Sequence, residues 1–142
     1  MNKYIEYERA KEKYRQSIEQ YDKLLSEKAD LFEKTQPTSP ALDHERVTGG
    51  ERVNKNDNYL IRKEELDEKI AAAHNILEGR KFIMELKKDE LKVSKSLHDR
   101  IYWYKYIENH KPKAIAMKVG YSEVQIYRIL KRIEKNIEKE KI

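Results

Sequence analysis

Two stretches of this chain repeat apolar residues at alternating steps of three and four, which limits them to helices that pack side by side along their length. Residues 1–34 form the first predicted helix, and seven of the nine residues at this spacing are apolar or aromatic: Tyr4, Tyr7, Lys11, Tyr14, Ile18, Tyr21, Leu25, Lys28 and Phe32. Residues 57–92 form the second, with its stripe at Tyr59, Lys63, Leu66, Ile70, Ala73, Leu77, Arg80, Met84, Lys87 and Leu91. Neither helix can bury its stripe alone. The sequence therefore predicts an all-α fold with a long, coiled-coil-like N-terminal hairpin, and leaves open whether the helices pair within one chain or between two.

The segment between these helices carries helix breakers. Residues 35–56 contain the prolines Pro37 and Pro40, which lack the backbone donor, followed by Gly49 and Gly50. We expect a flexible linker here, with Asn56 or Asp57 capping the next helix. On the second helix, Ile76 and Ile83 open another apolar stripe beside the main one, as if this helix touched more than one neighbour.

Composition removes several classes of protein. Charged residues make up 40% of the 142 residues and hydrophobic residues 38%, and there is no cysteine. Disulfides, thiolate zinc sites and thiol catalysis are therefore excluded. No apolar run is long enough to span a membrane, and the first residues are polar and charged where a signal peptide would be apolar. We expect a cytoplasmic protein.

The positive charge of the chain gathers in its last third. The net charge is +5, and residues 98–142 alone contain 11 Lys or Arg against 6 Asp or Glu, so the remainder is neutral. A basic segment beside a neutral one indicates that one end of the chain meets a polyanion.

Residues 93–142 have the spacing of a helix-turn-helix domain, with a supporting helix at 112–119 and a recognition helix at 122–139. A small residue, Ala116, stands where two steeply crossing helices come closest, and Gly120 stands where the turn needs a positive φ. Ser122 and Gln125 have the spacing of a capping box that starts the second helix. The apolar positions that lock the two helices are Ile115, Val119, Ile126 and Ile129.

The same segment supplies the predicted DNA-binding residues, which are Lys113, Lys118, Ser122, Glu123, Val124, Tyr127, Arg128, Lys131 and Arg132. Side chains at the start of a recognition helix reach base edges in the major groove, where Arg128 can pair with guanine. Lys113, Lys118, Lys131 and Arg132 suit phosphates. Glu123 suits either a cytosine amino group or the positive end of its own helix.

An aromatic run at residues 101–107 precedes the motif. We expect Ile101, Tyr104 and Ile107 to pack under the helix-turn-helix, and Tyr102 and Trp103 to face the hairpin or a partner protein.

The pattern Tyr106-Ile107, Ile115-Ala116, Val119-Gly120-Tyr121-Ser122, Val124 and Tyr127-Arg128-Ile129 resembles region 4 of sigma-70-type factors. It resembles more closely the ArpU/RinA-type regulators of phages and prophages of Gram-positive bacteria, over about residues 97–137. The resemblance implies a sequence-specific, DNA-binding transcriptional regulator, often an activator of late genes. Lys111-Pro112-Lys113 departs from the acidic or aromatic residues usual at that point of the family, which puts a polymerase-contacting role of the supporting helix in doubt.

Two alternatives stay open from the sequence: a sigma-like adaptor that binds RNA polymerase, and a DNA-packaging protein of the small-terminase type. The partners expected are double-stranded DNA, RNA polymerase and a second copy of the chain, with no membrane and no small-molecule substrate. The four histidines are scattered without metal-ligand spacing, and no phosphate loop or nucleophile motif occurs. We therefore expect no enzyme, no cofactor and no metal.

Overall fold

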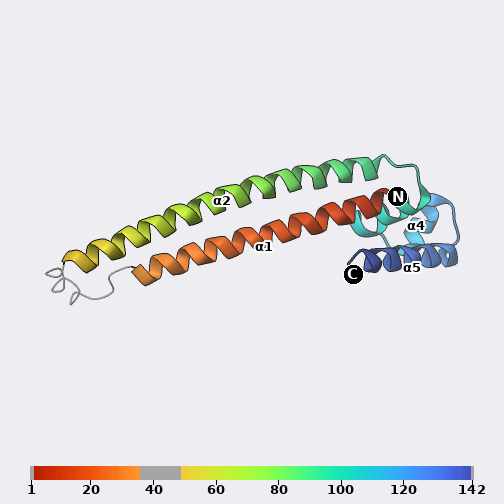
Figure 1. The fold of residues 1–142 in the computed structure, drawn as a ribbon. Helices are drawn as coiled ribbons and strands as arrows, with labels where there is room; N and C mark the ends of the chain where they lie inside the picture. The colour runs from red at the N-terminus through yellow and green to blue at the C-terminus, as the bar shows by residue number, and fades with distance from the viewer. Residues whose placement is uncertain (1, 36–48, 142) are drawn as a thin grey trace. The chain divides into compact units, whose positions relative to one another are not determined.

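A computed structural model describes residues 2–35 and 49–141 and shows that the fold is all-α, with no strand among these residues. The elements are α1 (Lys3–Thr35), α2 (Gly49–Lys92), α3 (Leu97–Tyr102), the π-helical turn η2 (Trp103–Ile107), α4 (Pro112–Val119) and α5 (Glu123–Glu140) (Figure 1). None of the described helices is both long and apolar enough to cross a membrane. The predicted class, a helical hairpin followed by a helix-turn-helix, is confirmed.

The second long helix begins earlier than the sequence predicts. The sequence predicts a start at residue 57, after a linker over residues 35–56, whereas α2 already begins at Gly49 and α1 includes Thr35. Residues 36–48 of the predicted linker lie outside the described residues. Glycine costs a helix less at its first turn than in its interior, and Glu51, Arg52 and Lys55 favour a helix once it has started.

The chain divides into two compact units, one of residues 1–15 and 79–142 and the other of residues 16–78. In the second unit, α1 and α2 run antiparallel and side by side. Lys28 and Asp67 form an ion pair of 2.6 Å across them, and the rings of Tyr21 and His74 lie 5.7 Å apart.

Beyond the first two turns, the predicted stripe of α1 is partly right: Tyr14, Tyr21 and Lys28 are partly covered as predicted, but the positions between them shift by one residue. Ser17 and Leu24 are buried, whereas their predicted neighbours Ile18 and Leu25 are exposed, as is Phe32. On α2 the prediction fits better, because Ala73 and Leu91 are buried and the other predicted positions, except the exposed Lys63, are at least partly covered.

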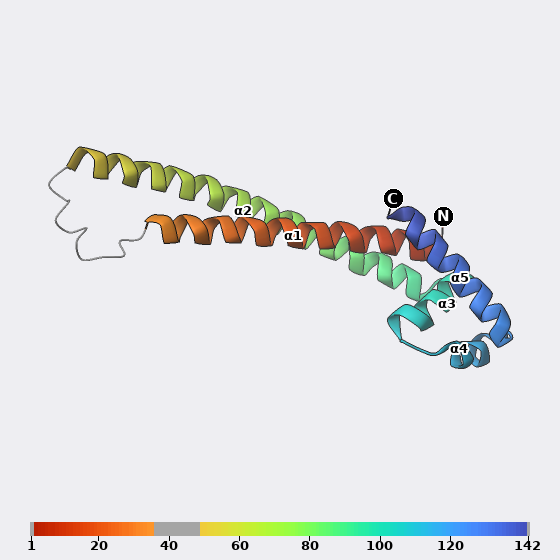
Figure 2. The ribbon, with the colours of Figure 1, turned by 90° about the horizontal axis from the view of Figure 1, so that it is seen from below.

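The first unit has one core, to which all its helices contribute. Its buried members are Tyr4, Ile5 and Tyr7 of α1, Leu91 of α2, Ile101 and Tyr102 of α3, Ile115 and Ala116 of α4, and Ile126, Leu130 and Ile133 of α5. The helix-turn-helix that the sequence places in a domain of its own, residues 93–142, therefore shares its core with the start of α1 and the end of α2. Both views show the first turns of α1, in red, beside α5, in blue (Figure 2).

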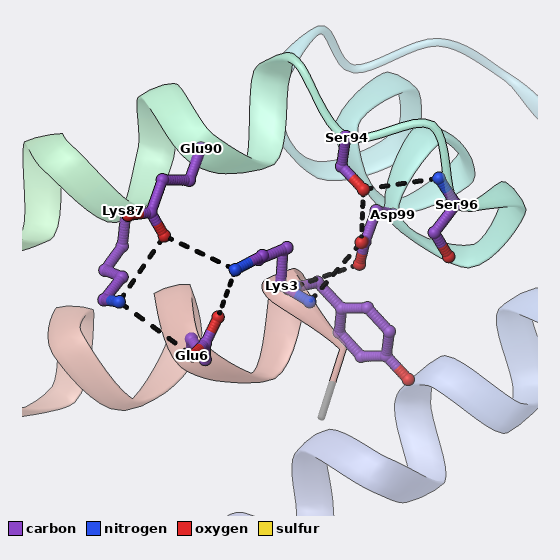
Figure 3. A network of polar contacts seen from close by, with 8 residues as sticks. Lys3, Glu6, Lys87, Glu90, Ser94, Ser96 and Asp99 are labelled. Atoms are coloured by element: carbon purple, nitrogen blue, oxygen red, sulfur yellow. Dashed lines mark hydrogen bonds and ion pairs between the residues drawn. The ribbon is translucent and has the colours of Figure 1, made fainter.

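A buried carboxylate holds the start of α1 in this unit. Asp99 of α3 is 1% exposed, and its Oδ1 accepts a hydrogen bond of 3.0 Å from the backbone N–H of Tyr4. Its Oδ2 accepts from the N–H of Lys3, at 3.4 Å, and from the Ser94 hydroxyl, at 2.7 Å. Figure 3 shows the carboxylate between these donors. Because the first N–H groups of a helix lack partners within it, Asp99 does for α1 what a capping residue normally does.

Most of the aromatic run separates as the sequence suggests, whereas Trp103, expected to face the hairpin or a partner protein, packs against the same core as Tyr104 and Ile107. Ile101 is fully buried, Tyr104 and Ile107 pack against the core, and Tyr102 is buried with its ring stacked on Tyr4 of α1 at 5.3 Å. Tyr102 thus faces the hairpin. Its hydroxyl donates to the carboxylate of Glu8, and burial together with this bond raises the pKa of Tyr102. The sequence does not predict the π-helical turn that follows, because the spacing of apolar residues does not distinguish it from an α-helix.

Candidate nucleic-acid interface

The supporting helix α4 begins and ends where its sequence requires. Lys111 has an extended backbone and Pro112 occupies the first turn, where the missing N–H of proline costs nothing. The helix turns Ile115 and Ala116 into the core. It ends at Gly120, whose φ of 78° lies in the left-handed region, and the N–H of Gly120 donates to the carbonyl of Ala116.

The second helix begins with the predicted capping box. The backbone N–H of Gln125 donates to the Ser122 hydroxyl at 3.3 Å, and the N–H of Ser122 donates to Gln125 Oε1 at 3.1 Å. These reciprocal bonds satisfy two backbone donors and fix the residue at which α5 starts. They also engage the amide oxygen of Gln125.

Helix α5 has one buried row and one solvent-exposed row. Ile126, Leu130 and Ile133 face the core. The row opposite, at steps of four and three, is exposed and runs through Val124, Arg128, Lys131, Lys135 and Glu138. Three of its five members are cations and the last is acidic, so the outer surface of α5 is basic from Arg128 to Lys135.

The predicted DNA-binding residues are all exposed, and those on α5 largely share this surface. Tyr127 and Arg132 flank the exposed row on either side. Glu123 instead follows the spacing of Ile126 and Leu130, which turns it away from the row. A carboxylate in the first turn stabilises the positive end of the helix, so the structure favours that role for Glu123.

The two predicted lysines of α4 are exposed, but Lys118 also contacts two neighbouring side chains. Its Nζ lies 5.1 Å from the centre of the Tyr104 ring and 3.5 Å from His110 Nε2. His110 in turn lies 3.1 Å from a carboxylate oxygen of Glu108. Lys118 is thereby held beside the turn that precedes α4, whereas no such contact is found for Lys113 in the described part of the chain.

Sequence reasoning missed three exposed residues on this part of the molecule. Lys135 lies seven residues after Arg128, beyond the span of the motif, and that spacing is the signal that finds it. Met117 is 80% exposed on α4, and Tyr121 is exposed in the turn. For Met117 and Tyr121, the spacing of apolar residues in the sequence does not show whether the side chain faces the core or the solvent.

Within the described residues, no group of histidine and carboxylate side chains is arranged to hold a metal ion. The chain was compared with protein-family models, curated proteins and solved structures, and none of them matches it.

Proposed function

We propose that this chain is a sequence-specific, double-stranded-DNA-binding regulator of transcription, of the ArpU/RinA phage and prophage type, acting in the cytoplasm on late genes. The observation that carries the proposal is the exposed row of α5 as far as Lys135: Val124, Arg128, Lys131 and Lys135 stand opposite the buried row of a helix that starts directly after a tight, glycine-centred turn. This is the arrangement in which a recognition helix enters the major groove.

Each side chain has a role that follows from its chemistry. Arg128 presents a planar fork for the O6 and N7 atoms of guanine, and Val124 offers an apolar contact to a thymine methyl group. Lys131 and Arg132, later on the helix, suit phosphates, as do Lys113 and Lys118 on α4.

A binding assay with a matched control tests the proposal. Sequences are first selected from a random duplex library with the full chain, and binding of the best one is then measured by fluorescence anisotropy. We expect the double variant Arg128→Ala, Lys131→Ala to bind at least tenfold more weakly, and to show a shallower dependence of log K on log salt, because fewer counterions are released.

The control removes the same charge elsewhere. Lys23 and Lys34 are exposed on α1, so Lys23→Ala, Lys34→Ala lowers the net charge equally without touching α5. The proposal fails if the library yields no enriched sequence, or if both double variants bind like the wild type.

A sigma-like adaptor that binds RNA polymerase is the second candidate, and exposed apolar side chains favour it. Val124 and Tyr127 are 60% and 55% exposed, and Met117 and Tyr121 are exposed nearby in the sequence. Exposed aromatic and methionine side chains are common anchors for a protein partner. Capture of RNA polymerase by the wild type but not by Met117→Ser, Tyr127→Ser, in the absence of any DNA binding, supports this candidate.

A further inference from the structure

His110 lies in the turn between η2 and α4, and the backbone of that turn fixes where its ring lies. Asn109, with a φ of 59°, takes the left-handed conformation that asparagine adopts more readily than most residues. The N–H of His110 then donates to the carbonyl of Tyr104 at 2.8 Å. The rings of His110 and Tyr104 meet edge to face, with their centres 5.9 Å apart. The imidazole is therefore held against the π-helical turn.

The imidazole lies between a carboxylate and an ammonium group. Its Nε2 is 3.1 Å from one carboxylate oxygen of Glu108 and 3.5 Å from Nζ of Lys118. The other carboxylate oxygen of Glu108 accepts from the indole N–H of Trp103 at 3.2 Å, and Lys118 Nζ lies 5.1 Å from the centre of the Tyr104 ring. Across residues 2–35 and 49–141, the ionisable groups that reach the imidazole by a hydrogen bond, ion pair or ring contact are Glu108, Tyr104 and Lys118.

The single nitrogen Nε2 cannot bond to both partners at once. A ring nitrogen of histidine has either a proton, which it donates, or a lone pair, which accepts. Lys118 requires the lone pair, because an ammonium group only donates, whereas Glu108 requires the proton, because a carboxylate only accepts. Neutral His110 with its proton on Nδ1 therefore holds Lys118. The imidazolium form has a proton on both nitrogens, so it binds Glu108 and repels Lys118.

We propose that His110 is a pH-dependent positioning residue for Lys118, an inference that rests on the proposed DNA-binding function. Neutral His110 keeps the ammonium group of Lys118 beside the Tyr104 ring, where cation–π attraction also favours it. Protonated His110 binds Glu108 instead and frees Lys118 to reach a DNA phosphate. Histidine is the side chain that changes charge between about pH 5 and 8, so DNA binding strengthens as the pH falls through this range.

NMR of the full chain without DNA tests the hold on Lys118. We expect nuclear Overhauser contacts between the Lys118 side chain and the Tyr104 ring at about pH 8, and their loss at about pH 5.5. In His110→Gln the side-chain amide offers a donor and an acceptor but no charge, so the contacts should persist at both pH values. His74→Gln, which removes an exposed histidine of α2, is the matched control and should behave like the wild type. Loss of the contacts in His110→Gln as well would overturn the proposal.

Fluorescence anisotropy tests the consequence for DNA binding, with the duplex enriched from the random library as the probe. Between about pH 8 and about pH 5.5 at constant ionic strength, we expect the affinity of the wild type to rise about threefold or more. The slope of log K against log salt should become steeper by about one, because one more phosphate is contacted. Both changes should be absent in His110→Gln and in Lys118→Gln, and present in His74→Gln.

The outcomes separate this inference from the function on which it rests. If the wild type binds no duplex at either pH, the proposed function fails and the inference fails with it. If the wild type binds DNA equally well at both pH values, or if His110→Gln keeps the pH dependence, the inference alone is wrong. A pH dependence that persists in Lys118→Gln shows that protonated His110 meets the phosphate itself, which also overturns the release of Lys118.

Discussion

At the scale of single residues, Asp99 shows how a charged side chain can be essential to a core. A buried carboxylate is unfavourable unless hydrogen bonds replace its water, and here three donors from two segments do so. One of these segments is the start of α1, about 95 residues away in the sequence. Asp99 therefore fixes where the chain begins to pack.

We expect Asp99→Ala to lower the free energy of unfolding by about 2 kcal/mol, because it leaves buried backbone N–H groups at the start of α1 without an acceptor. Urea unfolding followed by circular dichroism measures the change. Asp22→Ala, which removes an exposed aspartate of α1, should change it by less than about 0.5 kcal/mol. Equal effects of the two substitutions would show that the Asp99 hydrogen bonds contribute nothing specific.

At the scale of secondary-structure elements, the turn between α4 and α5 depends on the backbone conformation of one glycine. Gly120 has a φ of 78°, whereas a Cβ added there would meet nothing within 4 Å. The cost of a side chain at this position is therefore conformational and not steric.

We expect Gly120→Ala to destabilise the chain by about 1–2 kcal/mol. Gly79→Ala is the opposite case, since Gly79 lies inside α2 with equal room for a Cβ, and should stabilise the chain by up to about 1 kcal/mol. Thermal unfolding followed by circular dichroism compares the two substitutions. A stabilising Gly120→Ala would contradict the left-handed turn.

The turn could be predicted because its determinants are local. Gly120, Ser122 and Gln125 act within a few residues of one another, and the structure places each as the sequence indicates. The stripe of α1 could not be predicted in the same way. Adjacent apolar residues such as Leu24 and Leu25 offer two possible faces, and the choice depends on how α2 packs against α1.

The positions of the candidate site residues could also be predicted from local spacing, as far as the helix-turn-helix motif extends. Arg128 and Lys131 follow from their distance to Ser122, which starts the helix. Lys135 falls outside the recognised spacing, and the burial of Asp99 depends on contacts with α1 that no local pattern reveals.

At the scale of the whole molecule, the sequence suggests a division that the packing does not follow. Composition and motif separate residues 93–142 from the long helices, yet Tyr4, Tyr7 and Leu91 are buried in the same core as α3, α4 and α5. Further contacts join α1 to α5, where Arg9 binds Glu140 at 2.9 Å and Asn136 donates to the Tyr4 hydroxyl at 2.8 Å. The ion pair lowers the pKa of Glu140.

A pair of shortened chains tests whether the helix-turn-helix depends on this shared core. Residues 93–142 alone lack Tyr4, Ile5, Tyr7 and Leu91, which belong to the same core, so we expect low helicity and no cooperative thermal transition. Residues 2–15 joined by a short glycine-serine loop to residues 79–141 retain the whole unit, and Lys13 already lies beside Arg80 where the loop must close. We expect this second chain to be helical and to melt cooperatively, which far-UV circular dichroism measures for both. A cooperative transition in the fragment of residues 93–142 would show instead that the helix-turn-helix is an independent domain and that α1 only covers a core already formed.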